Sequence, residues 1–159
     1  MLFVSMGGLC RAPGAAGVLR HMLQEADLSE TITVDSVATH NYHLGEAPDG
    51  RVQFVCRRRG YDLSDMRVRQ ITLDDFRDYD MILATDWENL SYMQQICPRP
   101  LHHKLMLLMR FANDYEEATV PDPFYGGLDS FHKMLDYVED ACQGVFELVS
   151  RRTKPYQVA

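Results

Sequence analysis

The stretch that decides the fold reads Val4-Ser5-Met6-Gly7-Gly8-Leu9-Cys10-Arg11-Ala12-Pro13. Residues 1–5 form a short apolar run, which predicts a buried strand. Gly7 and Gly8 end this run, and Pro13 sits where the first turn of a helix tolerates a proline. From residue 14 to residue 26, apolar side chains recur at helical spacing. The stretch therefore predicts a strand, a glycine turn and a helix.

Residues 5–11, called the phosphate loop below, have the composition of an anion-binding turn. Glycines let the backbone take positive φ angles and turn successive N–H groups inward. A ring of amides at a helix N-terminus attracts a tetrahedral dianion, and Arg11 can add two parallel charge-assisted bonds. We expect Ser5 to open this loop and the anion to be held by Met6, Gly7, Gly8, Leu9, Cys10 and Arg11. Binding of the anion needs no metal or cofactor, because Arg11 and the amides supply the positive potential. The alternative to anion binding is a plain strand-to-helix turn.

The rest of the chain alternates predicted strands with predicted helices. Strands are expected at residues 31–35, 80–85 and 105–108, and helices at 52–59, 72–79, 86–96 and from 129 onward. Residues 36–50 are expected to form a loop. This order predicts an α/β protein: a three-layer fold with a central four-stranded parallel sheet flanked by helices, and the phosphate loop after the first strand. Ligands in such folds bind beyond the carboxyl ends of the strands.

Composition and charge exclude several classes of function. The chain of 159 residues has a formal net charge of -7, which argues against broad nucleic-acid binding. The arginine run at residues 57–59 is expected to be a solvated helix end, with docking of an anionic partner as the alternative. The four cysteines form no CxxC pair, and Cys142 lies on the apolar stripe of the last helix, as a core residue would. No apolar run is long enough to span a membrane, and we expect no secretory signal and a cytoplasmic location.

The spacing within the phosphate loop resembles that of a known enzyme family. Position 5 and Arg11 are separated by five residues, as in the C-x5-R signature of cysteine-based phosphatases. With Val-x-x-Gly before Cys10-Arg11 and Pro13 after it, the stretch resembles the low-molecular-weight protein tyrosine phosphatases. Their loop typically reads V-C-x-G-N-x-C-R-S-P. The resemblance runs from about residue 1 to residue 150, so we expect a phosphatase-like domain over 1–150 and a C-terminal tail over 151–159.

A second motif lies far downstream, where residues 120–127 read Val-Pro-Asp-Pro-Phe-Tyr-Gly-Gly. The family carries its general acid in a D-P-[YFW] loop, and the resemblance places that role on Asp122. It also places aromatic walls of the substrate pocket at Tyr42 on one side and at Phe124 and Tyr125 on the other. The implied ligands are a phosphotyrosine protein or a small aryl phosphate, with inorganic phosphate, sulfate or vanadate as simple site ligands.

The sequence departs from the family at the position that carries the chemistry. In the family a cysteine thiolate attacks phosphorus, whereas Ser5 has a hydroxyl that is not ionised near neutral pH. The Asn of the loop is Gly8 here, the Ser after the arginine is Ala12, and the aligned histidine position is Met66. A single engineered change would leave those supports in place, so the combined changes favour natural relaxation of the catalytic site.

Two functions follow from this resemblance. The first is a protein tyrosine phosphatase whose hydrolysis through a phosphocysteine is impaired by Ser5. The second is a pseudophosphatase, a relative that binds a phosphorylated partner without turnover. Arsenate reduction by a cysteine relay is disfavoured, because Ser5 replaces the loop cysteine and only Cys97 lies in the region of the relay. Attack by Cys10 is disfavoured because its spacing to Arg11 does not fit the signature.

Overall fold

The computed structural model describes residues 1–153. The strands are β1 (Leu2–Ser5), β2 (Asp35–Ala38), β3 (Ile82–Ala84) and β4 (Leu105–Leu107). The α-helices are α1 (Arg11–Glu25), α2 (Gly50–Arg58), α3 (Leu73–Asp78), α4 (Trp87–Ile96) and α5 (Leu128–Thr153). Two short 3-10 helices, η1 (Arg99–Lys104) and η2 (Leu108–Phe111), flank β4. Helix α5 thus continues past residue 150 to Thr153, and the rest of the expected tail lies outside the described residues.

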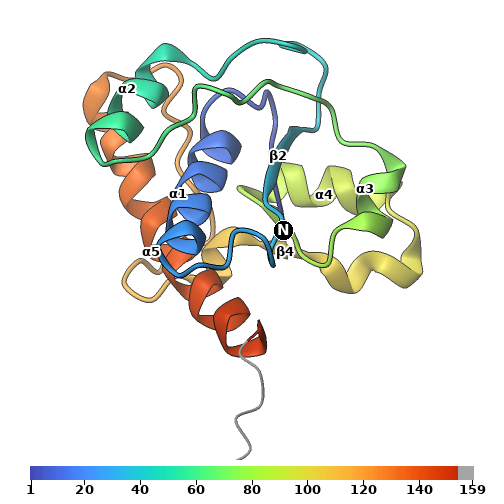
Figure 1. Ribbon diagram of the computed structural model, residues 1–159. Helices are drawn as coiled ribbons and strands as arrows, with labels where there is room; N and C mark the ends of the chain where they lie inside the picture. The colour runs from blue at the N-terminus through green and yellow to red at the C-terminus, as the bar shows by residue number, and fades with distance from the viewer. Residues whose placement is uncertain (154–159) are drawn as a thin grey trace, which may run out of the picture.

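The four strands form one parallel sheet in the order β2-β1-β3-β4, which confirms the predicted fold class. Helices α1, α2 and α5 cover one face, and α3 and α4 cover the other (Figure 1). Side chains alternate between the two layers, as strand geometry requires. Phe3 packs in the core under α1 and α5, whereas Leu2 and Val4 pack with Phe76 of α3 on the opposite face. The sheet is therefore buried on both sides.

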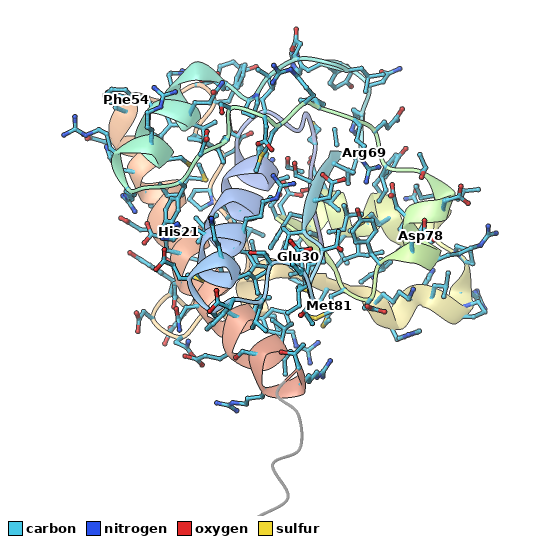
Figure 2. The ribbon with its side chains drawn as sticks, viewed as in Figure 1. His21, Glu30, Phe54, Arg69, Asp78 and Met81 are labelled. Carbon is cyan, nitrogen blue, oxygen red and sulfur yellow. The ribbon has the colours of Figure 1, made fainter. Side chains whose placement is uncertain are left out.

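The second strand begins four residues later than the sequence predicts. Residues 31–35 are β-branched and fit a strand by composition, but Thr31 and Ile32 bond back to Leu28 in a turn that follows α1. The ladder with β1 starts only at Asp35, which is paired with Leu2. The carboxylate of Asp35 also accepts at 2.9 Å from Arg69, whose side chain is labelled in Figure 2. Both the expected strand at 31–35 and the expected loop at 36–50 are therefore wrong at their shared boundary.

Local capping chemistry fixes the starts of the helices. The capping box between Thr72 and Asp75 is formed, and α3 begins as predicted. Asp49 accepts from the backbone N–H of Arg51 and opens α2 two residues before the predicted start. Helix α1 begins at Arg11, so that Pro13 lies in its first turn as predicted, and Cys10 is its N-cap.

The arginine run at 57–59 ends α2 without being wholly solvated. Arg59 donates to Asp136 at 2.8 Å and to Glu139 at 2.5 Å, and both acceptors belong to α5. The expectation of a free helix end is therefore wrong for Arg59, which ties α2 to α5.

Cys142, on the same side of the sheet, is fully buried in the core as predicted.

Backbone bonds at the carboxyl edge of the sheet bring three distant segments together. The N–H of Thr39 donates to Ser5 O at 3.0 Å, which fixes the chain after β2 beside the phosphate loop. The N–H of Thr85 donates to Val4 O at 3.0 Å, and the N–H of Val120 donates to Thr85 O at 2.8 Å. The segment that contains Asp122 is thereby anchored to the end of β3. Within residues 1–153, none of the helices is long and apolar enough to cross a membrane.

Candidate active site

The phosphate loop joins the end of β1 to the first turn of α1. Gly8 has a φ of +76°, a conformation that L side chains rarely adopt. A Cβ at this position would lie 3.0 Å from Ala38 Cβ and 3.1 Å from Val68 Cγ1, so space as well as conformation requires glycine. Gly7 does not have a positive φ, and the expectation that both glycines would is wrong. The resulting turn opens onto a pocket of about 270 Å³.

Arg11, at the start of α1, lines this pocket. Its side chain is only 7% exposed, and its Nη1 donates to Asp86 Oδ2 at 2.7 Å. Its Nη2 lies 3.8 Å from Asp122 Oδ2. A guanidinium has five N–H donors, so these contacts leave donors for a bound anion. The ion pair with Asp86 fixes the plane of the guanidinium before any ligand arrives.

Asp122 occupies an exposed turn at the mouth of the pocket. Its side chain is 56% exposed, and its Oδ1 accepts from the backbone N–H of Phe124 at 3.1 Å. Pro121 and Pro123 flank it and stiffen the backbone on both sides. One oxygen is thus held by the turn while the other faces Arg11, an arrangement that suits an acid at a fixed position.

The predicted substrate walls line the same pocket. Tyr42 follows β2 and is 65% exposed, Tyr125 is 97% exposed, and Phe124 is partly buried beside them. Flat, exposed rings around an anion site suit an aromatic phosphate ester. The structure therefore brings together every residue that the sequence analysis assigned to the site.

A second arginine supports the wall formed by Phe124. Arg51 is held by Asp49 through bonds of 3.0 Å and 2.9 Å, and its guanidinium lies 5.5 Å from the Phe124 ring centre. It also lies 4.7 Å from the ring of Phe131, which is fully buried in α5. Hydrogen bonding to Arg51 lowers the pKa of Asp49, which stays ionised and keeps the pair intact. Neither residue was predicted, because their role depends on ring contacts across the fold.

The nucleophile position holds a hydroxyl without any means of activation. Ser5 is 2% exposed, and within residues 1–153 its Oγ has no hydrogen-bond partner. A base in contact with this oxygen is therefore lacking. The nearby positions 8, 12 and 66 are also without polar support: Gly8 faces Ala38 and Val68, and Ala12 and Met66 are buried in the apolar core.

Cys10 does not replace the missing thiol. Its side chain is 5% exposed and belongs to the apolar core. Burial raises the pKa of Cys10 to about 12, a value that includes the raising effect of Asp49 and Asp122 and the smaller lowering effect of Arg51 and Arg11. The thiol is thus protonated at neutral pH and is a poor nucleophile.

Asp86 and His43 also belong to the site and were not predicted from the sequence. Asp86, which caps α4 and pairs with Arg11, lies 75 residues away from it along the chain. His43 lines the pocket, with its Nδ1 2.7 Å from Glu46 Oε2 and its Cδ2 3.4 Å from where a Gly7 Cβ would be. The imidazole therefore packs over Gly7 with its Nε2 on the loop side. Its position directly after Tyr42 was the only available signal.

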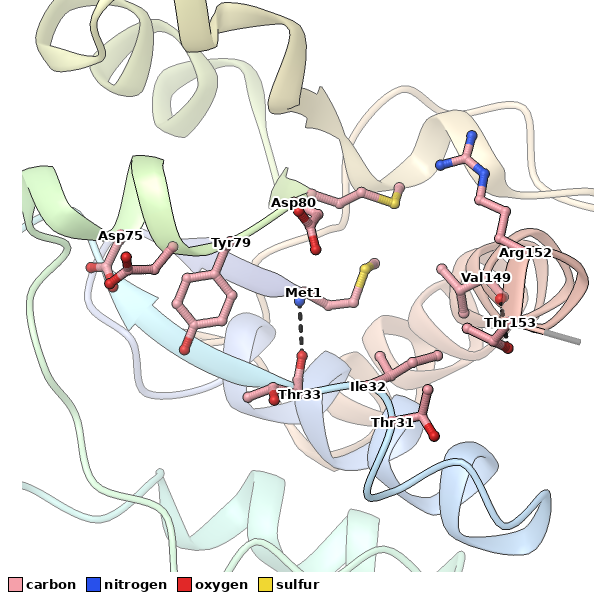
Figure 3. A pocket seen from close by; sticks show the side chains of 12 residues that line it. Met1, Thr31, Ile32, Thr33, Asp75, Tyr79, Asp80, Val149, Arg152 and Thr153 are labelled. Atoms are coloured by element: carbon pink, nitrogen blue, oxygen red, sulfur yellow. Dashed lines mark hydrogen bonds between the residues drawn. The ribbon is translucent and has the colours of Figure 1, made fainter. Parts of the chain in front are cut away.

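A larger cavity lies at the other edge of the sheet. It has a volume of about 750 Å³ and is lined by residues at the amino ends of the strands, among them Met1, Tyr79 and Asp80 (Figure 3). The ammonium group of Met1 donates to Thr33 O at 2.8 Å across it. This cavity lacks the amide ring and the paired arginine of the phosphate loop, so we place the candidate site at the smaller pocket. In the described part of the chain, no group of three or more acidic, histidine or cysteine side chains is arranged to hold a metal ion.

Comparison with known proteins shows which proteins this chain is similar to. Residues 1–155 match the sequence model of the family described as "Low molecular weight phosphotyrosine protein phosphatase". The chain is 34% identical over 151 residues to a Schizosaccharomyces pombe protein of that name, covering 94% of this chain and 96% of that one. It is 32% identical over 148 residues to the human protein of that name, covering 92% and 93%.

Among solved structures, the fold is similar to that of a protein tyrosine phosphatase from Entamoeba histolytica, determined with Hepes in its active site. The TM-score is 0.91 at 33% identity, covering 96% of this chain and 97% of that one. The similarity of fold thus extends over nearly the whole chain.

Proposed function

The chain belongs to the low molecular weight phosphotyrosine protein phosphatase family, and on that basis we propose that it binds phosphotyrosine groups with strongly impaired turnover. The observation that carries this proposal is the contrast within one pocket. The anion-binding parts are intact and pre-organised, whereas the buried Ser5 Oγ lacks both a base and a partner.

Anion binding is supported by the geometry of the phosphate loop. The loop runs into the N-terminus of the 15-residue helix α1, where backbone amides and the helix dipole favour a dianion. Arg11 is nearly buried and already oriented by Asp86, so little side-chain entropy is lost on binding. The Entamoeba relative holds Hepes, a sulfonate, in its active site. Phosphate, sulfate and vanadate are accordingly proposed as ligands here.

Binding of an aromatic ester is supported by the walls of the pocket. Tyr42, Phe124 and Tyr125 surround the mouth, and Arg51 holds Phe124 in place. We propose a phosphotyrosine protein, or a small aryl phosphate, as the ligand class. A cytoplasmic location is consistent with four cysteines that are all free and buried.

Impaired turnover is supported by the chemistry of position 5. Formation of a phosphoenzyme requires an ionised nucleophile, and a serine hydroxyl without a base is not ionised near neutral pH. Cys10 is excluded as a substitute by its burial and its high pKa. Asp122 is still placed to donate a proton to a leaving oxygen, which favours slow residual hydrolysis as the second candidate function.

Two measurements on one protein distinguish these functions. Titration calorimetry with phenylphosphonate, a phosphate ester mimic that is not hydrolysed, measures binding. Hydrolysis of p-nitrophenyl phosphate measures turnover. The proposal predicts saturable binding that is lost in Arg11→Ala, with hydrolysis indistinguishable from buffer. Hydrolysis above buffer that disappears in Asp122→Ala would establish the enzymatic function instead, and absence of binding would refute both.

A further inference from the structure

A second hollow lies beside the phosphate loop and is lined by residues that follow β2 and by residues of α4. It has a volume of about 320 Å³, and Met6 of the phosphate loop lines both this hollow and the phosphate pocket. The other residues used below are His40, Glu88, Tyr92 and Gln95. A ligand held in the phosphate loop therefore has this hollow next to it.

Three aromatic rings connect the pocket with the hollow. Tyr42, on the wall of the phosphate pocket, stacks on His40 with ring centres 5.2 Å apart and planes 22° apart. His40 in turn lies 5.6 Å from the ring of Tyr92, on α4. The Nδ1 of His40 is 2.7 Å from Thr39 Oγ1, and this contact fixes the ring that stands between the two tyrosines. The rings form a continuous surface that leads from the phosphate to α4.

The charge of the hollow is negative. Glu88 is exposed in the first turn of α4 and forms no ion pair within residues 1–153. No lysine or arginine lines the hollow, and Gln95 adds a further amide. Arg11 of the neighbouring phosphate pocket is already paired with Asp86. A carboxylate beside aromatic faces is the environment that favours a guanidinium, which can stack on a ring and pair with the carboxylate at once.

We propose that this hollow binds the side chain of an arginine close to the phosphotyrosine in the partner protein. Alternate residues of an extended peptide point to the same face and are about 7 Å apart. An arginine two residues from the phosphotyrosine can thus reach Glu88 and Tyr92 while the phosphate is in the loop. The inference rests on the proposed function, because the phosphate must first be held there. It adds a preference among phosphotyrosine partners for those with a nearby arginine.

Binding of matched phosphopeptides tests this subsite. The peptides are identical except at the second residue before or after the phosphotyrosine, which is arginine, citrulline or glutamate. Citrulline has the shape of arginine without its charge. We expect arginine at one of the two positions to bind roughly three- to tenfold more tightly than citrulline at low salt. Glutamate should bind more weakly than citrulline, and 0.5 M salt should reduce the differences.

Two variants and one control locate the effect. In Glu88→Gln the preference for arginine over citrulline should fall to about one, and in Tyr92→Leu it should be reduced. Glu25→Gln, at the exposed end of α1 and the far edge of the sheet, should retain it. Equal affinity for arginine and citrulline at both positions, with normal binding of inorganic phosphate, would overturn the subsite alone. Loss of phosphate binding as well would overturn the proposed function with it.

Discussion

Replacement of Ser5 with cysteine is expected to turn this protein into a measurable phosphatase. Ser5 is 2% exposed at the base of the phosphate loop, and its Oγ makes no bond that the substitution would break. Cysteine is nearly isosteric with serine, so the loop should keep its shape. The thiol would meet the N-terminus of α1 and the Arg11 guanidinium, which favour a thiolate. Asp122 remains 3.8 Å from Arg11, placed to protonate the leaving oxygen.

The size of the gain follows from what the site lacks. Removal of the nucleophile from a serine protease lowers kcat by about 10⁶-fold, which we take as an upper limit for restoration. Compared with the family, the site lacks the serine hydroxyl at position 12, which is Ala12 here. It also lacks the asparagine and histidine at positions 8 and 66, which are Gly8 and Met66 in apolar surroundings. A hydrogen bond to a charged group contributes about 1.5–3 kcal/mol, or roughly ten- to hundredfold. Two such losses reduce the limit to about 10²–10⁴-fold, and we expect a gain near 10³-fold.

The assay is hydrolysis of p-nitrophenyl phosphate by Ser5→Cys, with Ser5→Ala as the matched control without a nucleophile. Adding Asp122→Asn to Ser5→Cys should lower the restored rate by about 10²-fold. If a folded Ser5→Cys protein binds phosphate but hydrolyses p-nitrophenyl phosphate less than tenfold faster than the native protein, the explanation of the lost turnover by Ser5 is wrong. In that case either Asp122 is not a competent acid or the loop does not stabilise a thiolate.

Three further results are expected. Phosphate at one hundred times its Kd should stabilise the native state by about 2.7 kcal/mol. For a chain of this length that is a rise in Tm of roughly 5–11 °C, and an equal rise in Arg11→Ala would contradict Arg11 as a ligand. Iodoacetamide at pH 7.5 should label none of the native thiols, including Cys10, because all are buried with raised pKa values. The Ser5→Cys protein should gain one labelled thiol, and rapid labelling of native Cys10 would show that its environment is not as described. The hydrogen bond from Arg51 lowers the pKa of Asp49, so its stabilisation is full above the unfolded pKa of about 3.9 and is lost as pH falls through the folded value. Calorimetry should therefore show that Tm falls less steeply with falling pH in Asp49→Asn than in the native protein. Equal falls in the two proteins would show that the pair of Asp49 with Arg51 does not stabilise the fold.

The local parts of the site were predictable from the sequence because they depend on short spacing. Five residues between position 5 and Arg11 define the turn, and a proline on each side of Asp122 defines a stiff loop. The alternation of elements also predicted the parallel sheet, because crossover helices force that arrangement. Glycine alone, however, did not specify which residue takes the positive φ. That depends on Ala38 and Val68, which approach Gly8 from elsewhere in the fold.

The parts that were missed depend on partners distant in the chain. The β-branched run at residues 31–35 fits a strand, but pairing with β1 begins only at Asp35. Asp86 becomes part of the site only because β3 ends beside β1, and this adjacency sets the Arg11 side chain. His43 enters the pocket because the chain after β2 folds over Gly7. Register and loop direction, rather than residue type, decide these contacts.

Phosphorus NMR on the native protein distinguishes binding of a phosphotyrosine group without turnover from its hydrolysis. Free phosphotyrosine is added at a concentration equal to that of the protein, and its resonance is followed for a day. Binding without turnover predicts a shifted or broadened phosphotyrosine signal, with no inorganic phosphate formed during the day. With Arg11→Ala the signal should be unshifted. Growth of an inorganic phosphate resonance that depends on Asp122, or an unshifted resonance in the native protein, would contradict binding without turnover.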